Sequence, residues 1–418
     1  MPTTSSLIPI RELQKARLAL DSIVDRTPLH LNAGISKKYK ANIYLKREDL
    51  QNVRSFKIRG AYYKMSTLTA EERINGIVCA SAGNHAQGVA MACAKLDIQG
   101  TIFMPTTTPN QKITRVDHFG EGKVEIRLTG DTFDDSNITA REYATLHGKA
   151  FIHPFDDPDV IAGQGTVAIE VIEDIKVPID YLIVTVGGGG LIAGMASYFK
   201  VLSPQTKIIA VEAEGAPSLL KAMEAGKVVK LESIDGFADG IATKSVGQIP
   251  LDICKESVDQ HILVAEGKMC VTILSLYNEE AIVVEPACAA AIAALDNIAD
   301  DIKGKNVVCV LSGGNNDITR TEEIKERAML FEGKKHYFIV KFPQRAGALR
   351  EFLDLLGPND DIARFEYTKK TNRGSGPALV GIELKDVQDF KPLVTRMKAA
   401  DIDFQHLNES PLLFEMLV

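Results

Sequence analysis

The feature that most constrains the fold is a series of short strand-like segments that alternate with helix-like segments between about residues 40 and 312. The predicted strands are 76–80, 100–105, 123–128, 181–186, 207–213 and 306–311, and the last three are continuous apolar runs with β-branched residues. Runs without polar alternation fit strands that are covered on both faces, as in parallel sheets. The alternation therefore predicts an α/β fold built on a doubly wound parallel sheet.

Three of the predicted strands end in loops of small residues. These loops are "SAGNH" (81–85), "GGGGL" (187–191) and "SGGNN" (312–316). Ligands of doubly wound sheets bind outside the carboxyl ends of the strands. We therefore expect the three loops to open on the same side of the sheet and to surround one site.

Composition excludes several classes of protein. A 45% hydrophobic and 25% charged chain of 418 residues is an ordinary globular composition, and its net charge of −7 argues against a dedicated nucleic-acid binder. The six cysteines lack CxxC spacing, which is typical of reduced thiols in a cytoplasmic protein. The N-terminus shows no secretory signal, and the longest apolar run, 281–295, is interrupted by Glu285 and Pro286. We expect a cytoplasmic protein that contacts neither nucleic acid nor membrane.

The C-terminal part changes character. After a charged helix-like segment at 319–335, residues 336–418 follow a β-α-β-β-α-β order, which predicts a small ferredoxin-like module. The predicted division is a large domain over 1–320, made of two α/β subdomains with the smaller at about 50–150, then a linker helix over 321–335 and the module over 336–418.

The glycine loop at 187–191 predicts a phosphate site. Glycines before a helix expose backbone N–H groups that can cradle a phosphate, and a merely flexible connection would not justify their entropic cost. The kind of phosphate stays open. Gly188, Gly190 and Ala193 fit a dinucleotide pattern, and Glu212 ends the next predicted strand, where a ribose-binding acid belongs. A nicotinamide oxidoreductase is therefore an alternative.

The other two loops have more than one interpretation. Ser81, Gly83 and Asn84 precede a helix and can bind a carboxylate, although the loop judged alone favours ordinary helix capping. His85 alone is more often structural than catalytic. The Ser312 hydroxyl can bond a ring nitrogen, or can merely belong to a turn.

Lys57, in "RSFKIRG", is a candidate for covalent catalysis. A lysine amine can bind the aldehyde of pyridoxal phosphate (PLP), but most lysines are simply solvated. The sequence shows no metal-ligand cluster and no GxSxG, HExxH or Walker A motif. The residues alone leave the role of Lys57 undecided.

Taken together and in order, these stretches resemble the fold-type II PLP-dependent amino-acid dehydratases. The similar segments cover most of residues 25–318: "LKREDLQNVRSFKIRGA", "SAGNHAQGVA", "HPFDDPDVIAGQGTVAIE", "VGGGGLIAG", "ADGIA" and "VVCVLSGGN". The stretch "FIVKFPQRAGALREFLDLL" resembles the ACT-like regulatory domain of biosynthetic threonine dehydratases (threonine ammonia-lyases). There is room for one such domain, as in the short form of that family.

The resemblance implies a role for each residue that would hold PLP. Lys57 matches the lysine that binds the cofactor covalently and removes the substrate α-proton, and Phe56 lies against the ring. Asn84 bonds the ring's phenolic oxygen, and Ser312 faces the pyridine nitrogen. The residues that match the phosphate cradle are Gly187, Gly188, Gly189, Gly190 and Leu191.

The resemblance also implies a substrate site and no metal site. The loop that binds the substrate carboxylate comprises Ser81, Gly83, Asn84 and His85. In the related serine racemases a cation is bound near the positions of Glu212, Ala216 and Ser218, but Ser218 replaces an acidic ligand, so no divalent metal is expected.

The activity that the resemblance implies is conversion of L-threonine to 2-oxobutanoate and ammonia, the first step of isoleucine biosynthesis. Isoleucine is expected to inhibit through the ACT-like domain, with valine opposing it. Such regulation requires two global states, so a homo-oligomer, dimer or tetramer, is expected. The alternatives are a catabolic serine/threonine dehydratase, an NAD-dependent oxidoreductase and a non-enzymatic amino-acid sensor.

Overall fold

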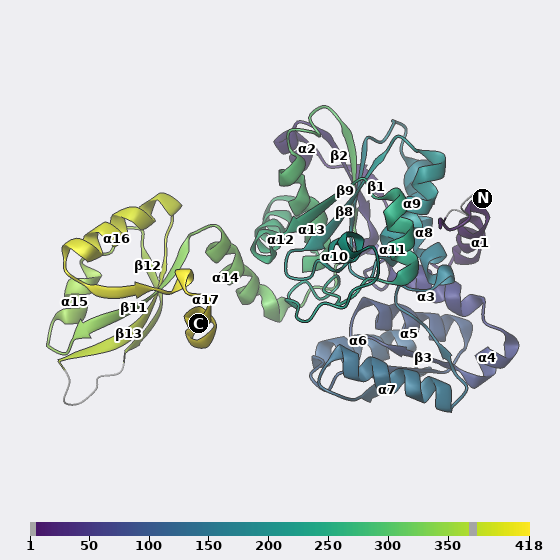
Figure 1. Ribbon diagram of the computed structural model, residues 1–418, viewed down its shortest axis with the longest axis horizontal. Helices are drawn as coiled ribbons and strands as arrows, with labels where there is room; N and C mark the ends of the chain where they lie inside the picture. The colour runs from purple at the N-terminus through teal and green to yellow at the C-terminus, as the bar shows by residue number, and fades with distance from the viewer. Residues whose placement is uncertain (1–5, 368–373) are drawn as a thin grey trace. The chain divides into compact units, whose positions relative to one another are not determined.

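The computed structural model describes residues 6–367 and 374–418. Its contacts divide the chain into a first unit that ends at Ile318 and a second unit that begins at Thr319 (Figure 1). Among the described residues, none of the helices has the length and apolar character needed to cross a bilayer.

The larger sheet of the first unit has six strands in the order β1-β2-β10-β7-β8-β9. Their bounds are β1 (Leu29–Leu31), β2 (Asn42–Arg47), β7 (Tyr181–Thr185), β8 (Lys207–Ala213), β9 (Gln260–Val264) and β10 (Asn306–Leu311). All neighbours are parallel except β1, which is antiparallel to β2. Buried aliphatic side chains cover the sheet, as a parallel sheet requires.

Helices cover both faces of this sheet. They are α1 (Ile10–Leu20), α2 (Ala33–Tyr39), α8 (Pro158–Asp174), α9 (Gly190–Leu202), α10 (Ser218–Ala225), α11 (Gln248–Ser257), α12 (Glu266–Glu280) and α13 (Pro286–Ala293), with 3-10 turns η1 (Glu48–Leu50) and η2 (Ala294–Ile298). Figure 1 shows α12 and α13 on one side of the strands and α8 and α9 on the other. This arrangement confirms the predicted doubly wound α/β class.

The smaller sheet is fully parallel, in the order β5-β4-β3-β6. Its strands are β3 (Ile77–Ala80), β4 (Gly100–Met104), β5 (Val124–Leu128) and β6 (Ala150–Phe151). The helices of this subdomain are α3 (Lys57–Ser66), α4 (Ala70–Asn75), α5 (Asn84–Leu96), α6 (Asn110–Gly120) and α7 (Phe133–Leu146). All six predicted strands belong to one or other sheet.

The expectation that the three small-residue loops open from one sheet is wrong. The loop at 81–85 follows β3 of the smaller sheet, whereas those at 187–191 and 312–316 follow β7 and β10 of the larger one. The loops at 81–85 and 312–316 still meet, because the amide of Asn315 donates to that of Asn84 at 2.7 Å. Apolar runs identify strands, but they do not show which strands pair.

A buried ion network fixes the start of α3, and therefore Lys57. Arg59 donates to Glu48 from Nε at 2.8 Å and to Glu170 from Nη1 at 2.7 Å. Lys46, on β2, donates to Glu170 at 2.5 Å. All four side chains are almost completely buried, and their charges balance, as buried charges must.

The second unit is the predicted ferredoxin-like module. Its antiparallel sheet has the order β12-β13-β11-β14. The elements are α14 (Thr321–Phe331), β11 (Lys335–Pro343), α15 (Ala348–Leu353), β12 (Asp361–Tyr367), β13 (Ser375–Glu383), α16 (Phe390–Ala399), β14 (Asp403–His406) and α17 (Pro411–Leu417), with turns η3 (Ile318–Arg320), η4 (Val387–Asp389) and η5 (Leu407–Glu409). The helix at the start packs on this module, since Glu326 accepts from Tyr337 Oη at 2.5 Å.

Candidate active site

Lys57 is the first residue of α3, and its side chain is half-buried. Its amine donates to the backbone oxygen of Pro154 at 3.0 Å and lies 5.3 Å from the ring centroid of Phe56. Burial lowers the pKa of the amine to about 8, although Glu285 opposes the shift. A lysine with a pKa near neutrality supplies a useful share of free amine, which is the form that acts as nucleophile or base.

The glycine loop at 187–191 connects β7 to α9. A Cβ atom at Gly188 would overlap the ring of Phe155, and Gly189 has a φ of +90°, which glycine adopts without strain. Within residues 6–367 and 374–418, the N–H groups of this loop donate to no protein acceptor. Unengaged N–H groups at the start of a helix form an anion site, so the geometry fits the predicted phosphate cradle.

Ser312 directly follows β10 and is buried. Its backbone oxygen accepts from the N–H of Phe56 at 3.2 Å, which joins the loop after β10 to the residue before Lys57. In the part of the chain that the structure describes, the Ser312 hydroxyl makes no hydrogen bond. That hydroxyl is available for a ring nitrogen, and its assigned role stays a prediction.

Asn84 belongs to a network that sequence reasoning missed. Its Nδ2 donates to both carboxylate oxygens of Glu285, at 2.8 and 3.0 Å, and its Oδ1 accepts from Asn315. Burial raises the pKa of Glu285 to about 7. The predicted bond from Asn84 to a phenolic oxygen is untested by these contacts. The signal for Glu285 was present in the sequence as a lone acid within an apolar run.

The loop at 81–85 leads into α5. Gly83 is the N-cap and donates to Ser81 Oγ at 3.2 Å. The His85 ring is buried and donates from Nε2 to the backbone oxygen of Ile152 at 3.0 Å, and burial lowers its pKa to about 3. His85 is therefore neutral, and its buried Nδ1 has no hydrogen-bond partner among the described residues. The backbone N–H groups of Asn84 and His85 have no acceptor among the described residues, so they can receive a carboxylate.

The structure argues against the nicotinamide alternative, because Glu212 is not available to bind a ribose. Glu212 is completely buried and accepts from the N–H groups of Leu219 and Leu220 at 2.7 and 2.9 Å. The carboxylate therefore stabilises the start of α10 and is unavailable for a ligand. Among the residues that the structure describes, no group of three or more His, Cys, Asp or Glu side chains is arranged to hold a metal ion.

The residues present fit pyridoxal phosphate. One short segment, Pro154 and Phe155, contacts both the Lys57 amine and the glycine loop, so the amine and the proposed cradle belong to one site. That site holds an amine of lowered pKa, N–H groups without an acceptor for a phosphate, and the Ser312 hydroxyl, which makes no hydrogen bond in the described chain, for a ring nitrogen. These are the three kinds of group that the cofactor requires.

Two family models match the chain. The first describes pyridoxal-phosphate dependent enzymes and matches residues 20–313. The second describes the C-terminal regulatory domain of threonine dehydratase and matches residues 326–417. The two matches fall on the first and second units in turn.

Curated proteins and solved structures agree with these matches. The biosynthetic L-threonine dehydratase IlvA of Bacillus subtilis is 56% identical over 99% of this chain and 98% of its own length, and that of Halalkalibacterium halodurans is 55% identical over 98% and 99%. The structure of threonine deaminase isoform 2 from Solanum lycopersicum, in its processed form, is similar with a TM-score of 0.73 and 41% identity, over 77% of this chain and 88% of that one. The chain therefore belongs to the pyridoxal-phosphate dependent enzymes and, within them, to the family of biosynthetic threonine dehydratases.

Proposed function

We propose that this chain converts L-threonine to 2-oxobutanoate and ammonia. The observation that carries the proposal is the half-buried Lys57 amine, of lowered pKa, beside a glycine loop whose N–H groups are unengaged. The relatives named L-threonine dehydratase support the choice of substrate, because they align over nearly the whole chain.

The residues of the site divide the work of binding. Pyridoxal phosphate, when bound, withdraws electrons from the carbon that carries the substrate amino group and so makes its proton removable. The N–H groups of residues 187–191 hold the phosphate, Ser312 Oγ faces the ring nitrogen, and Phe56 covers the ring. Ser312 is uncharged, so it does not enforce a positive charge on that nitrogen, which favours elimination over transamination.

Lys57 moves the proton in this proposal. Its Nζ accepts the proton from the α-carbon, while the N–H groups of Asn84 and His85 hold the substrate carboxylate. The β-hydroxyl leaves with a proton as water, and a second water later replaces the nitrogen. One water is lost and one is consumed, so threonine yields 2-oxobutanoate and ammonium without any other reactant.

The test compares Lys57→Ala with Lys95→Ala, an exposed lysine on α5 of the same subdomain. We expect 2-oxobutanoate from the wild type and from Lys95→Ala, and none from Lys57→Ala. A band near ~410 nm that borohydride removes should accompany activity, with the reduced cofactor on the Lys57 peptide. A labelled peptide elsewhere would contradict the assignment, and faster turnover of serine than threonine would favour a catabolic enzyme.

We also propose a division of labour along the chain, with catalysis in residues 1–320, the helix at 321–335 as connection and regulation in the ACT-like module at 336–418. Isoleucine inhibits through this module and valine opposes it, in a homo-oligomer. The match of residues 326–417 to a regulatory domain supports this proposal.

The regulatory proposal requires a response that depends on the second unit. A chain that ends at Ile318 should keep threonine turnover and lose inhibition by isoleucine, whereas the full chain should show both. Calorimetry with isoleucine on the full chain and sedimentation with and without it provide the binding and the oligomeric state. Inhibition that survives the truncation would contradict the proposal.

A further inference from the structure

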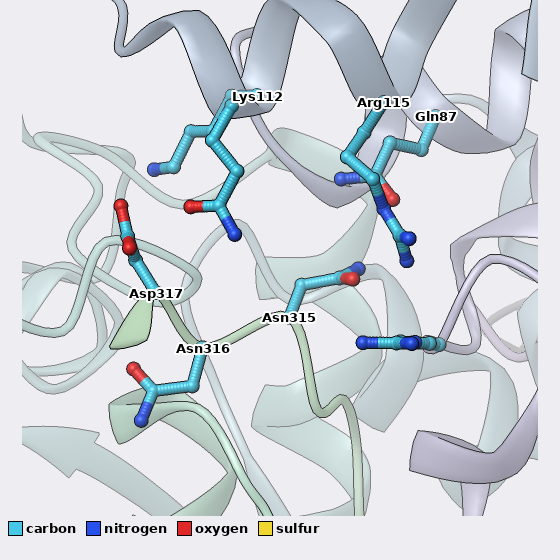
Figure 2. A pocket seen from close by; sticks show the side chains of 8 residues that line it. Gln87, Lys112, Arg115, Asn315, Asn316 and Asp317 are labelled. Atoms are coloured by element: carbon cyan, nitrogen blue, oxygen red, sulfur yellow. The ribbon is translucent and has the colours of Figure 1, made fainter. Parts of the chain in front are cut away.

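A small polar pocket lies in the first unit, outside the residues assigned to catalysis (Figure 2). Its volume is about 70 Å³, enough for a few water molecules or one small polyatomic ion. Residues of α6 form one wall, and the segment after β10 forms the other, so the pocket lies between the two subdomains.

The pocket is lined by more positive than negative charge. Arg54, Lys112 and Arg115 contribute three cations, and Asp317 contributes a carboxylate. Lys112 pairs with Asp239 at 2.5 Å, but in the described part of the chain the guanidinium groups of Arg54 and Arg115 make no ion pair and no hydrogen bond. Burial and the neighbouring Arg54 lower the pKa of Arg115, so two unpaired cations oppose each other here.

The backbone of Arg54 is strained. Its φ is +56°, in the left-handed region that a glycine would occupy without penalty. Its N–H donates to the backbone oxygen of Gln51 at 2.6 Å, and its own oxygen accepts from Gly314 at 2.9 Å, so the surroundings enforce this conformation. An arginine at such a position indicates that the side chain has a task, because a glycine would be more stable there.

Two amide side chains of the lining lack partners. Gln87 is 3% exposed, and its buried Oε1 has no hydrogen bond within residues 6–367 and 374–418. Asn316 Oδ1 is likewise buried and unpartnered. Gln87 and Arg115 both line the pocket (Figure 2). Buried amides without partners are costly, which indicates a bound group that the protein atoms alone do not supply.

The pocket is connected to the candidate active site through Asn315. This residue also lines the pocket, and its Nδ2 donates to Asn84 Oδ1 at 2.7 Å and to the backbone oxygen of Val53 at 2.8 Å. Asn84 in turn donates to Glu285. A ligand in the pocket would therefore contact a residue that positions the predicted substrate loop.

We propose that this pocket binds a small oxyanion, a phosphate or carboxylate group, between the guanidinium groups of Arg54 and Arg115. Guanidinium groups suit this task because their N–H donors match the spacing of two oxygens of either group. An oxyanion accepts hydrogen bonds, so Gln87 donates to it from Nε2 once its amide turns over, which takes the unpartnered Oε1 away from the ligand. The site is separate from the glycine loop, and it needs no turnover in order to be detected.

The experiment is calorimetry on the holoenzyme in a buffer without oxyanions, so that the cofactor fills the glycine loop. Inorganic phosphate and butanoate are titrated separately into the wild type, Arg115→Gln, Arg54→Gly and Lys95→Gln. Lys95→Gln is the matched control, since it removes one exposed positive charge from the same subdomain. We expect saturable binding by the wild type and the control, weakened roughly tenfold or more in both arginine variants.

The outcomes separate the sources of the oxyanion. Binding of phosphate alone identifies a phosphate ligand, and binding of butanoate alone identifies a carboxylate. Arg54→Gly relieves the strained φ, so it should fold at least as well as the wild type and still lose affinity. If Arg115→Gln does not fold, Arg115→Lys keeps the charge and should bind less tightly than the wild type. No saturable binding, or equal affinity in the arginine variants, would overturn the proposal.

Discussion

Replacement of Arg59 by leucine is the sharpest test of what holds the catalytic lysine in place. Arg59 lies two residues after Lys57 and is completely buried. It donates to Glu48 and Glu170 through Nε, Nη1 and Nη2 at 2.7–3.0 Å. The variant leaves two buried carboxylates with Lys46 as their only cation in the network.

The expected loss in the free energy of unfolding is large because the remaining carboxylates stay buried, away from water. Removal of one partner of a buried ion network costs about 3–5 kcal/mol, most of it from the charge left uncompensated. Arg26 provides a control, because it also pairs with two carboxylates, Glu173 at 2.7 Å and Asp174 at 2.5 Å, but its side chain is 41% exposed. Arg26→Leu should cost less than about 1 kcal/mol, since water replaces the lost partner.

The dependence on pH distinguishes lost charge pairing from lost packing. Burial raises the pKa of Glu170, but Arg59 and Lys46 outweigh burial and hold that pKa below its ordinary value. The wild type therefore keeps this stabilisation above about pH 4.5 and loses it as the pH falls. Without Arg59, burial dominates and raises the pKa of Glu170, so the variant loses stability as the pH rises. The difference in the free energy of unfolding between the wild type and Arg59→Leu should be larger at pH 8 than at pH 5.

The assay is urea denaturation of the wild type, Arg59→Leu and Arg26→Leu at both pH values, with the midpoint and slope compared. The reasoning would be refuted if Arg59→Leu lowered the free energy of unfolding no more than Arg26→Leu does. A stability difference that becomes smaller from pH 5 to pH 8 would also refute it, because an unpaired buried carboxylate predicts a difference that grows with pH.

Three further predictions follow from other parts of the structure. Gly188→Ala should weaken pyridoxal phosphate binding roughly tenfold or more in an absorbance titration, because its Cβ would overlap Phe155, whereas Gly236→Ala, with open space around it, should not. Burial raises the pKa of Glu285 to about 7, so ionisation of this carboxyl opposes folding. The free energy of unfolding of Glu285→Gln, measured by denaturation relative to the wild type, should therefore rise between about pH 4.5 and 7 and stay constant above pH 7. Burial lowers the pKa of His336 to about 4, so the second unit should lose stability as the pH falls from about 6.5 to 4, and hydrogen exchange in β11 should show less of that loss in His336→Gln.

Hydropathy predicted the strands with a clear apolar run and missed β2, which has only a short one. The runs at 181–186, 207–213 and 306–311 correspond to β7, β8 and β10. β2, with the sequence "NIYLKR", gave no such signal, although it is paired between β1 and β10. Its Lys46 is completely buried because Glu170, 124 residues later, neutralises it. The sequence of one strand cannot reveal that its charge is neutralised by a residue so far along the chain.

The candidate site was predictable where one loop carries its own signal. Four glycines before a helix predict exposed N–H groups, and the structure has them without protein acceptors. Glu285 gave only a weak signal, because its relation to Asn84, 201 residues away, depends on how the two sheets are placed. The assigned roles of Lys57, Ser312 and the substrate loop stay predictions that the variants above can test.

The contacts that join the two subdomains explain why neither local pattern nor apolar periodicity assembles this site. The link between Asn84 and Asn315 and the ion pair between Lys112 and Asp239 are both polar contacts between segments far apart in sequence. Each places a group from the smaller subdomain against a loop of the larger one. Lys57 starts a helix whose Arg59 is bound by ion pairs to η1 and α8, whereas the substrate loop is bound through Asn84 to Asn315. The position of Lys57 relative to the substrate loop therefore depends on polar contacts between the subdomains, which the neighbouring residues in "RSFKIRG" do not reveal.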